Sequence, residues 1–251
     1  MEISIELLFF LFAASVVAGT MDTMVGGGGL ITLPSLMLTG LPLINALGTN
    51  KLQGSVGTAT ATFLLLRKSK IRWRHIRPLF IAAFVGSAIG TVAVQFIDQA
   101  ALSVIIPVVL VLIIVYFLFY NPGRSRNFSI KVGAGKFTYL VVPGIGFYDG
   151  MFGPGTGSFF TFSNVLLRRA KLVAATATAK PLNFATNVAS LAVFILFGNV
   201  VWQVGVVMML GQAIGAWMGV HFLYRVHPQY LRAFVITICL LMLAKYLASV
   251  A

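Results

Sequence analysis

Two lysines lie deep inside apolar stretches that carry no other charge. Lys51 and Lys180 are about seven and nine residues from the start of their stretches. If the stretches are helices that cross a membrane, both ammonium groups lie roughly 10–14 Å below its surface. A lysine at membrane depth costs about 2.5–3.5 kcal/mol and usually faces a cavity or a partner. The two lysines predict an anion-binding site. The structural alternative is that each snorkels to the surface or pairs with a carboxylate.

Two of the five acidic residues, Asp22 and Asp149, each precede a glycine cluster. Burial would tune their acidity, so either could bind a coupling proton or cation. Alternatively, each aspartate caps the helix that follows, because its oxygens accept hydrogen bonds from free backbone N–H groups. A third interpretation pairs each aspartate with a lysine.

Glycine-rich clusters at 26–29 and 153–157 each open a short apolar run. Glycine and proline do not sustain a straight helix there. Irregular backbone at membrane depth survives only inside protein or beside a cavity. Its N–H groups, and the positive end of the helix that follows, would attract an anion. The predicted backbone contacts are Gly27, Gly28, Gly155 and Gly157. The alternative is that glycine merely permits a turn or tight packing.

Polar side chains that could hydrogen-bond the oxygens of an anion cluster around both lysines. They are Thr49, Asn50, Gln53, Thr178, Asn183 and Asn187. The substrate contacts predicted from this set are Thr49, Asn50, Thr178 and Asn183. The alternative is hydrogen bonding between helices, the commoner role of such residues in membranes.

The composition of the chain is that of a membrane protein. Its 251 residues are 59% apolar and only 9% charged, with a mean hydropathy of +0.98. Soluble domains carry about 25% charged residues, so a soluble enzyme is excluded and a multi-pass membrane protein is predicted. The net charge of +13 comes from basic clusters between apolar runs, which the positive-inside rule explains without nucleic acid. One cysteine and three scattered histidines provide no disulfide framework or metal cluster, and no cofactor is predicted.

The chain contains two related halves. Its apolar runs are about 3–21, 30–40, 44–66, 78–97, 101–120, 137–152, 157–167, 172–197, 203–224 and 229–250. A shift of 127 residues superposes Asp22 on Asp149. After two inserted residues, a shift of 129 superposes Lys51 on Lys180. We infer a duplication, with a first membrane repeat at 1–120, a cytoplasmic linker at 121–136 and a second membrane repeat at 137–251.

Equivalent loops of the two halves carry opposite charge bias. The loop around Trp73 is rich in lysine and arginine, whereas the loop around Trp202 has neither. Three basic residues follow the short run that ends near 167, whereas the equivalent loop of the first half has none. Equivalent loops therefore belong on opposite sides of the membrane. This predicts inverted repeats of five segments each, with both termini outside.

The inverted arrangement places Asp22 towards the same face as Lys180, and Asp149 towards the same face as Lys51. Ion pairs between the halves are compatible with it. The alternative is that the short runs re-enter without crossing, in which case each half has four spans and the halves are parallel.

The order and duplicated placement of these motifs resemble the TauE/SafE family of membrane proteins. The first half carries the glycine cluster, Pro34 and the segment ALGTNK at 46–51, and the second half repeats the pattern in degenerate form at 153–159 and 174–180. The resemblance covers nearly the whole chain. It implies a secondary transporter in the cytoplasmic (inner) membrane that exports sulfite, an organosulfonate such as sulfoacetate, or another small anion. Because Pro154 replaces a glycine and Ala179 stands where Asn50 does, we expect the halves to contribute unequally.

These observations predict an all-α polytopic membrane protein of two inverted repeats of five membrane segments, each with one short broken helix. It would carry a small anion by alternating access. The sequence contains no ATP-binding motif, so an ion or substrate gradient, or partners outside this chain, would supply the energy, with protons as the candidate coupling ion. We expect no enzymatic activity. The expected partners are the anion and the lipid bilayer, and an oligomer is compatible with the sequence. Two other classes stay open: an uncoupled channel for small anions or solutes, and a membrane scaffold or assembly protein.

Overall fold

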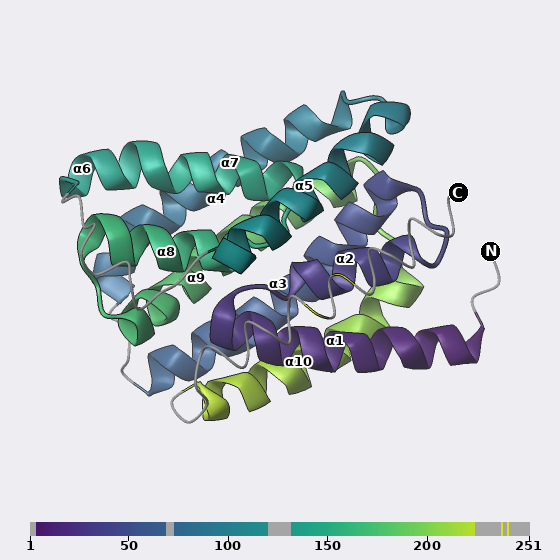
Figure 1. Cartoon of the computed structure of the whole chain (residues 1–251), viewed down its shortest axis with the longest axis horizontal. Coiled ribbons are helices and arrows are strands. Elements are labelled where there is room, and N and C mark those ends of the chain that lie inside the picture. The colour runs from purple at the N-terminus through teal and green to yellow at the C-terminus, as the bar shows by residue number, and fades with distance from the viewer. Residues whose placement is uncertain (1–3, 69–72, 120–131, 224–236, 238–239, 241–251) are drawn as a thin grey trace.

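The computed structural model describes residues 4–68, 73–119 and 132–223, together with 237 and 240, and every regular element in them is helical. The helices of the first half are α1 (Ile5–Val25), α2 (Gly29–Met37), α3 (Leu43–Arg67), α4 (Trp73–Gln95) and α5 (Gln99–Phe119). Those of the second half are α6 (Ala134–Lys136), η2 (Phe137–Val141), α7 (Val142–Met151), α8 (Thr156–Arg168), α9 (Leu172–Leu196) and α10 (Trp202–Phe222). The predicted all-helical class is confirmed for this part of the chain (Figure 1).

The helix boundaries follow the internal repeat. α3 and α9 are each 25 residues long, and both their starts and their ends lie 129 residues apart. α6, η2 and α7 continue one another and together correspond to α1. Helix therefore begins at Ala134, inside the segment assigned to the linker and three residues before the boundary expected at 137. Residues 121–131 of the predicted linker, and nearly all of the last predicted segment at 229–250, lie outside the described residues.

The first long helix of each half packs along a helix of the other half. α1 packs along α10, and α7 packs along α4, at glycines whose lack of a side chain lets the backbones touch. A Cβ added to any of these glycines would meet a backbone carbonyl of the facing helix at 2.1–2.7 Å. The pairs are Gly86 with Pro143, Gly90 with Phe147, Gly215 with Val16 and Gly219 with Thr20. Packing therefore explains the glycine pairs spaced four residues apart on α4 and α10, as expected for small residues between membrane helices.

Equivalent helices of the two halves run in opposite directions. Residue numbers rise together along the α4–α7 contact and along the α1–α10 contact, so each pair is parallel. The end of α4 meets the start of α10, where the Asn199 side chain donates to Gln95 Oε1 at 2.6 Å. Asn199 also meets Gly48 near the start of α3, and α3 runs parallel to α10, whereas α4 begins just after α3 ends and returns to this end. α4 and α10 are therefore antiparallel, and so are α1 and α7. Figure 1 shows the same relation, with α1 entering from one end of the molecule and α6 and α7 from the other.

Basic side chains gather at one end of the molecule. At this end Arg168 donates to Val132 O at 3.2 Å and lies over the ring of Phe137, with Ile76 of α4 in the same apolar cluster. All the described lysines and arginines except Lys51 and Lys180 belong to this end, by contact or by chain neighbourhood. They are Arg67, Lys68, Arg74, Arg77, Lys136, Arg168, Arg169 and Lys171. The basic residues that distinguish the loops in the sequence therefore lie, where the structure describes them, at the same end of the molecule.

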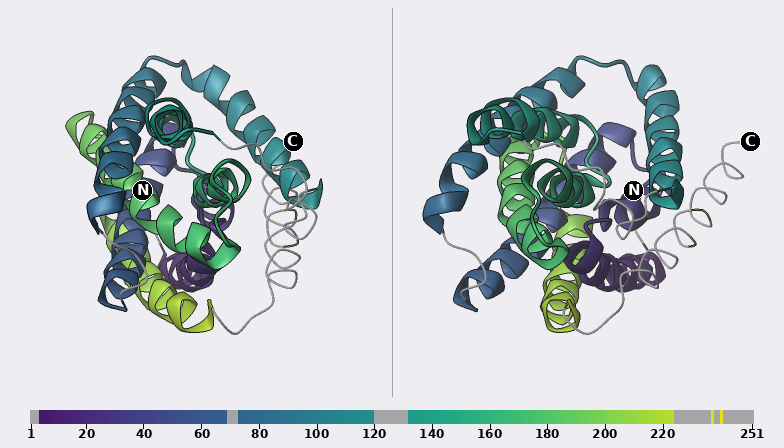
Figure 2. Two further views of the ribbon diagram at one scale, coloured as in Figure 1. Left: turned by 90° about the vertical axis from the view of Figure 1, so that its left-hand side faces the viewer. Right: turned by 60° about the vertical axis from the view of Figure 1, so that its left-hand side comes forward.

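Four helices among the described residues are long and apolar enough to cross a membrane, namely α1, α4, α9 and α10. α3 is as long as α9 but less apolar, because it carries Asn50, Lys51 and Gln53, which are all buried. α4, α5 and α10 lie on the outside of the bundle (Figure 2) and expose large apolar side chains such as Ile89 and Leu210. An outer surface of this kind suits lipid rather than water.

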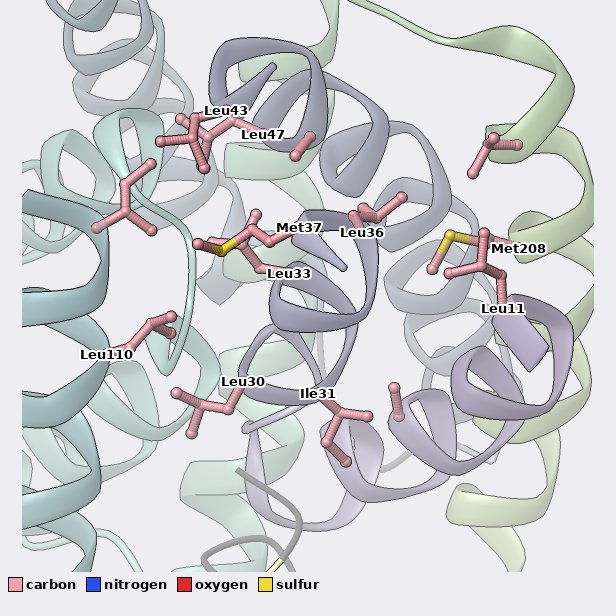
Figure 3. Close-up of a cluster of buried hydrophobic side chains, with 14 of the residues drawn as sticks. Leu11, Leu30, Ile31, Leu33, Leu36, Met37, Leu43, Leu47, Leu110 and Met208 are labelled. Carbon is pink, nitrogen blue, oxygen red and sulfur yellow. The ribbon is translucent and has the colours of Figure 1, made fainter. Parts of the chain in front are cut away.

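α2 is a short helix enclosed by its neighbours. Eight of its nine residues, from Leu30 to Met37, are buried, and most of them are apolar. Figure 3 shows its side chains pointing outward in several directions, with Leu110 of α5 facing Leu30. Nine residues rise about 13 Å, against about 30 Å of hydrocarbon. α2 is therefore too short to cross a bilayer alone, and its start lies inside the molecule.

Candidate functional site

The two glycine clusters break their helices by adopting backbone conformations that favour glycine. α1 ends at a left-handed cap, Gly26, with φ 87° and its N–H donating to Asp22 O at 2.8 Å. In the second half, Gly153 and Gly155 have φ 94° and 80°. A residue with a Cβ rarely adopts these angles. The breaks inferred from the sequence are therefore present, and α2 and α8 start directly after them.

The two breaks touch each other at the centre of the molecule. A Cβ on Gly26 would lie 2.3 Å from the backbone of Gly157, and a Cβ on Gly157 would lie 2.7 Å from Gly26 Cα. Ser158 donates from its backbone N to Gly26 O at 3.2 Å and from its hydroxyl to Val25 O at 2.6 Å. The N-termini of α2 and α8, the positive ends of their helix dipoles, are thereby brought together.

The first lysine of the repeat forms a buried ion pair with the second half. Lys51 Nζ lies 2.8 Å from Asp149 Oδ2 and donates to Asp149 O at 2.5 Å. The other carboxylate oxygen, Oδ1, accepts from the hydroxyl of Thr156 at 2.6 Å. Both charged side chains are at most 2% exposed. The carboxylate thus joins α3 to the start of α8.

The second lysine, Lys180, pairs with Asp22 of the first half, and this pair is less buried. Lys180 Nζ lies 3.4 Å from Asp22 Oδ2 and also donates to Asp22 O. Asp22 Oδ1 accepts from Gly28 N at 3.3 Å. The Asp22 side chain is 16% exposed, whereas that of Asp149 is 1% exposed. This pair is therefore the more accessible of the two.

Each lysine also binds a backbone carbonyl in the last turn of a broken helix. Asp22 O already accepts from Gly26 N, so Lys180 is its second donor, and a cation at a helix C-terminus is favourable. Lys180 and Lys51 supply that cation, while each carboxylate accepts a bond from the break that follows it. The pairing of lysine with aspartate across the halves, one of the interpretations left open by the sequence, is thus present. So are aspartate contacts to the residues that open α2 and α8.

A cavity lies where the breaks and the ion pairs meet. Its empty volume is about 400 Å³, including its opening. Within the described residues its lining consists of glycines and polar or charged side chains, without an apolar side chain. The lining residues are Asp22, Gly26, Gly28, Gly29, Asn50, Lys51, Gln53, Gly54, Thr58, Asp149, Gly153, Gly155, Thr156, Gly157, Asn183, Asn187 and Gln212. Such a lining suits a small hydrophilic solute.

Most residues proposed from the sequence as substrate or coupling contacts line this cavity. Those that do are Lys51, Asn50, Asn183, Gly28, Gly155, Gly157, Asp22 and Asp149. Lys180, Thr178 and Gly27 are absent from the lining, although Lys180 reaches it indirectly through Asp22. Thr49 is also absent, because its buried hydroxyl accepts from Val201 N at 3.0 Å beside the start of α10. The structure therefore assigns Thr49 to a contact between helices.

Several residues that line the cavity were not among the substrate contacts predicted from the sequence. Asn50, Gly54 and Thr58 are spaced four residues apart on α3 and so share one helix face. The shift of 129 maps Thr58 onto Asn187, which also lines the cavity. That helical spacing, combined with the repeat, would have identified both. Gln212 had no such signal, because its equivalent in the first half is Ala83.

Asn50 and Gln53 in the cavity wall belong to a hydrogen-bonded set with Thr32, which does not itself line the cavity. Asn50 Oδ1 accepts from the hydroxyl of Thr32 at 2.6 Å and from Gln53 Nε2 at 2.7 Å. Asn50 and Gln53 are 6% and 2% exposed. Gln53 Oε1 has no hydrogen-bond partner among the described residues. A buried carbonyl left in this way costs about 1–3 kcal/mol and therefore calls for a ligand or water.

Comparison with known proteins connects this arrangement to membrane transport. Residues 11–246 match the protein family described as "Sulfite exporter TauE/SafE". The chain is 41% identical over 245 residues to a "Probable membrane transporter protein" of Haemophilus influenzae, covering 98% of this chain and 96% of the relative. It is 36% identical over 241 residues to the "Probable membrane transporter protein YfcA" of Escherichia coli K12, covering 96% and 90%. No solved structure gives a significant match.

Proposed function

The chain belongs to the sulfite exporter TauE/SafE family of membrane transporters, and on this premise we propose that it exports a small anion by alternating access. The candidate cargo is sulfite or an organosulfonate, and the location is the cytoplasmic membrane. The observation that carries the proposal is the polar cavity between the two glycine breaks, which collects Lys51, amide side chains and glycine backbone from both halves.

Electrostatics support an anionic cargo. An oxyanion entering a site of low dielectric loses hydration and needs fixed positive partners. Lys51 provides a full charge at the cavity wall, and the starts of α2 and α8 add partial positive charge without another buried side chain. Lys51 already neutralises Asp149, so a substrate anion would compete with that carboxylate for the same ammonium group. This competition gives a direct route from substrate binding to rearrangement of the contact between the halves.

The geometry of the halves supports alternating access. Equivalent helices run in opposite directions, and the cavity lies between α3 and α9, with both helix breaks in its wall. Transporters with inverted repeats and paired broken helices rock one repeat against the other around a central site. We propose ten membrane segments in two inverted repeats, with the basic end in the cytoplasm and both termini outside. In this arrangement, rocking towards one side of the membrane would stretch one Lys–Asp pair, and rocking towards the other side would stretch the other pair.

Counterflow in proteoliposomes tests the function. Vesicles containing purified protein are loaded with unlabelled sulfite, diluted into a trace of radiolabelled sulfite and sampled with time. A carrier accumulates label transiently above equilibrium, because outward unlabelled anion drives inward labelled anion through the same site. An uncoupled channel equilibrates label without overshoot, and a scaffold protein leaves uptake at the level of empty vesicles.

A matched control uses Thr60→Val. The Thr60 hydroxyl donates to Val56 O within α3 at 2.8 Å, and the residue does not belong to the cavity lining. This variant should retain the overshoot, whereas Lys51→Gln should reduce it. Organosulfonates replace sulfite in parallel assays to identify the cargo. Failure of every anion to produce counterflow would overturn the proposal.

A further inference from the structure

We infer that the anion bound in this cavity carries a single negative charge and one O–H group, and that Asn50 and Gln53 select it. Hydrogen sulfite and the hydroxyalkanesulfonates are anions of this class. The inference rests on the proposed function and specifies its substrate. It is carried by the side-chain hydrogen bonds of the cavity wall and by the charges around it.

Within the part of the chain that the structure describes, the amide pair leaves one donor and one acceptor without a hydrogen bond. Asn50 Oδ1 accepts from both Thr32 and Gln53, which leaves Gln53 Oε1 without a partner among the described residues. Asn50 Nδ2 points towards the second break, where a Cβ added to Gly153 would lie 3.7 Å from it. Exchanging oxygen and nitrogen in both amides preserves the bonds among the three side chains. That exchange again leaves one N–H₂ group and one carbonyl unused, so this result does not depend on the amide orientation.

An unused buried carbonyl selects for a donor on the ligand. A site built to bind a hydroxyl rejects the analogue that lacks it, because its own polar group then stays unpaired. The oxygens of a simple oxyanion are acceptors only and would satisfy Lys51 and the amide N–H₂ but not the carbonyl. An O–H on the same anion would complete the set by donating to the carbonyl.

The charges at the site favour a monoanion over a dianion. Lys51 and Lys180 are balanced by Asp149 and Asp22, so the formal charges of the four paired groups cancel. Every negative charge on the ligand is therefore opposed only by partial positive charges from backbone N–H groups, and the cost rises with each charge. Burying an uncompensated charge is costly, so a doubly charged anion should bind more weakly.

The amide pair exists in one half only. The shift of 129 places Ala179 at the position of Asn50 and Leu182 at that of Gln53, and both are fully buried. The second half therefore offers no matching donor and acceptor at these positions. The inferred hydroxyl contact is single and asymmetric, although the lysines and aspartates around it are duplicated.

Two sulfonates of the same charge and nearly the same size test the inference. Ethanesulfonate ends in a methyl group where hydroxymethanesulfonate has a hydroxyl. Their affinities are measured by isothermal titration on the purified full-length protein, with sulfate as the dianion. The parent protein should bind hydroxymethanesulfonate on the order of tenfold more tightly than ethanesulfonate, the worth of one well-formed hydrogen bond. Sulfate should bind more weakly than either.

The Gln53→Met variant keeps the length of the side chain and removes its amide. It should bind both sulfonates about equally, because the group that distinguishes them is gone, and a single size-exclusion peak shows that the variant is folded. Gln53→Leu, which copies Leu182 of the second half, is a second variant with the same expectation, and Thr60→Val is the control that keeps the preference.

Equal binding of both sulfonates by the parent, or a preference that survives in Gln53→Met, would overturn the substrate class but leave anion transport standing. Tighter binding of sulfate would overturn the charge argument. Absence of binding by every anion would overturn the proposed function itself.

Discussion

Lys51 Nζ on α3 lies 2.8 Å from Asp149 Oδ2 on α7, so one half of the chain supplies the cation and the other half the carboxylate. The reciprocal pair, Lys180 with Asp22, is longer at 3.4 Å and includes the more exposed carboxylate. Both lysines also bind the backbone carbonyl of the same aspartate. Both pairs connect the two halves close to the glycine breaks.

A double-mutant cycle should show strong coupling between Lys51 and Asp149. Lys51→Gln or Asp149→Asn alone leaves a buried charge without its partner, which should cost about 3–5 kcal/mol of stability. The double variant should be more stable than the two single losses added together. The measurement is chemical unfolding in detergent. The same cycle on Lys180 and Asp22 should give a smaller coupling, and additive losses at Lys51 and Asp149 would contradict the assigned pair.

Anion affinity should depend more on Lys51 than on Lys180. Lys51 lines the cavity whereas Lys180 does not, so Lys51→Gln should weaken binding by about 1–3 kcal/mol, the worth of a charge-assisted hydrogen bond. Lys180→Gln should have a smaller effect, transmitted through Asp22. Sulfite or sulfonate affinity is measured on purified, folded variants. If both variants bind as tightly as the parent, the lysines are structural and the anion site lies elsewhere.

Asp22 is the better candidate for coupling to protons. Its side chain lines the cavity and is more exposed than that of Asp149. Asp22→Asn should keep substrate binding but lose the dependence of transport on an imposed pH gradient, measured in proteoliposomes. Asp149→Asn should mainly lower the yield of folded protein, because that carboxylate holds both Lys51 and Thr156. If Asp22→Asn likewise only lowers the yield, its role is capping.

The contact between the two breaks should tolerate no side chain. Gly26→Ala combines φ 87° with a Cβ 2.3 Å from Gly157, so we expect little or no folded protein. Gly144→Ala is the matched control, because a Cβ there meets nothing within 4 Å. Inside α7 it should be neutral or stabilising by up to about 1 kcal/mol. Folded yield is measured by size-exclusion chromatography, and a well-folded Gly26→Ala protein would refute the close contact.

Reporter fusions test the proposed topology. A reporter active only in the periplasm should be active after Ala251 or when inserted at Gly198, whereas one active only in the cytoplasm should be active at Ala170. The reason is that the described basic residues lie at the end that contains Ala170, and basic loops stay inside. A cytoplasmic signal after Ala251 would contradict the arrangement of ten segments.

Local properties of the sequence were enough to predict the class of the protein, its broken helices and its duplication. Composition and apolar run length decide between water and lipid as solvent, glycine clusters interrupt helices wherever they occur, and the repeat preserves the order of Asp22 and Lys51 in Asp149 and Lys180. These inferences need no knowledge of which helices touch. The predicted runs overlap the described helices, but α1 ends at Val25 rather than near 21, α4 begins at Trp73 rather than near 78, and helix in the second half begins at Ala134 rather than near 137.

Tertiary packing decided which side chains meet. Adjacent residues of a helix point about 100° apart, so Thr49 bonds the start of α10 while Asn50 faces the cavity. Nothing in the sequence near Gln212 indicates that α10 brings it to the same cavity. The pairing of each aspartate with a lysine likewise depends on distances between the halves that only the fold sets. Chemistry at this site arises from contacts between residues distant in the chain, and a local pattern records the residue types but not their partners.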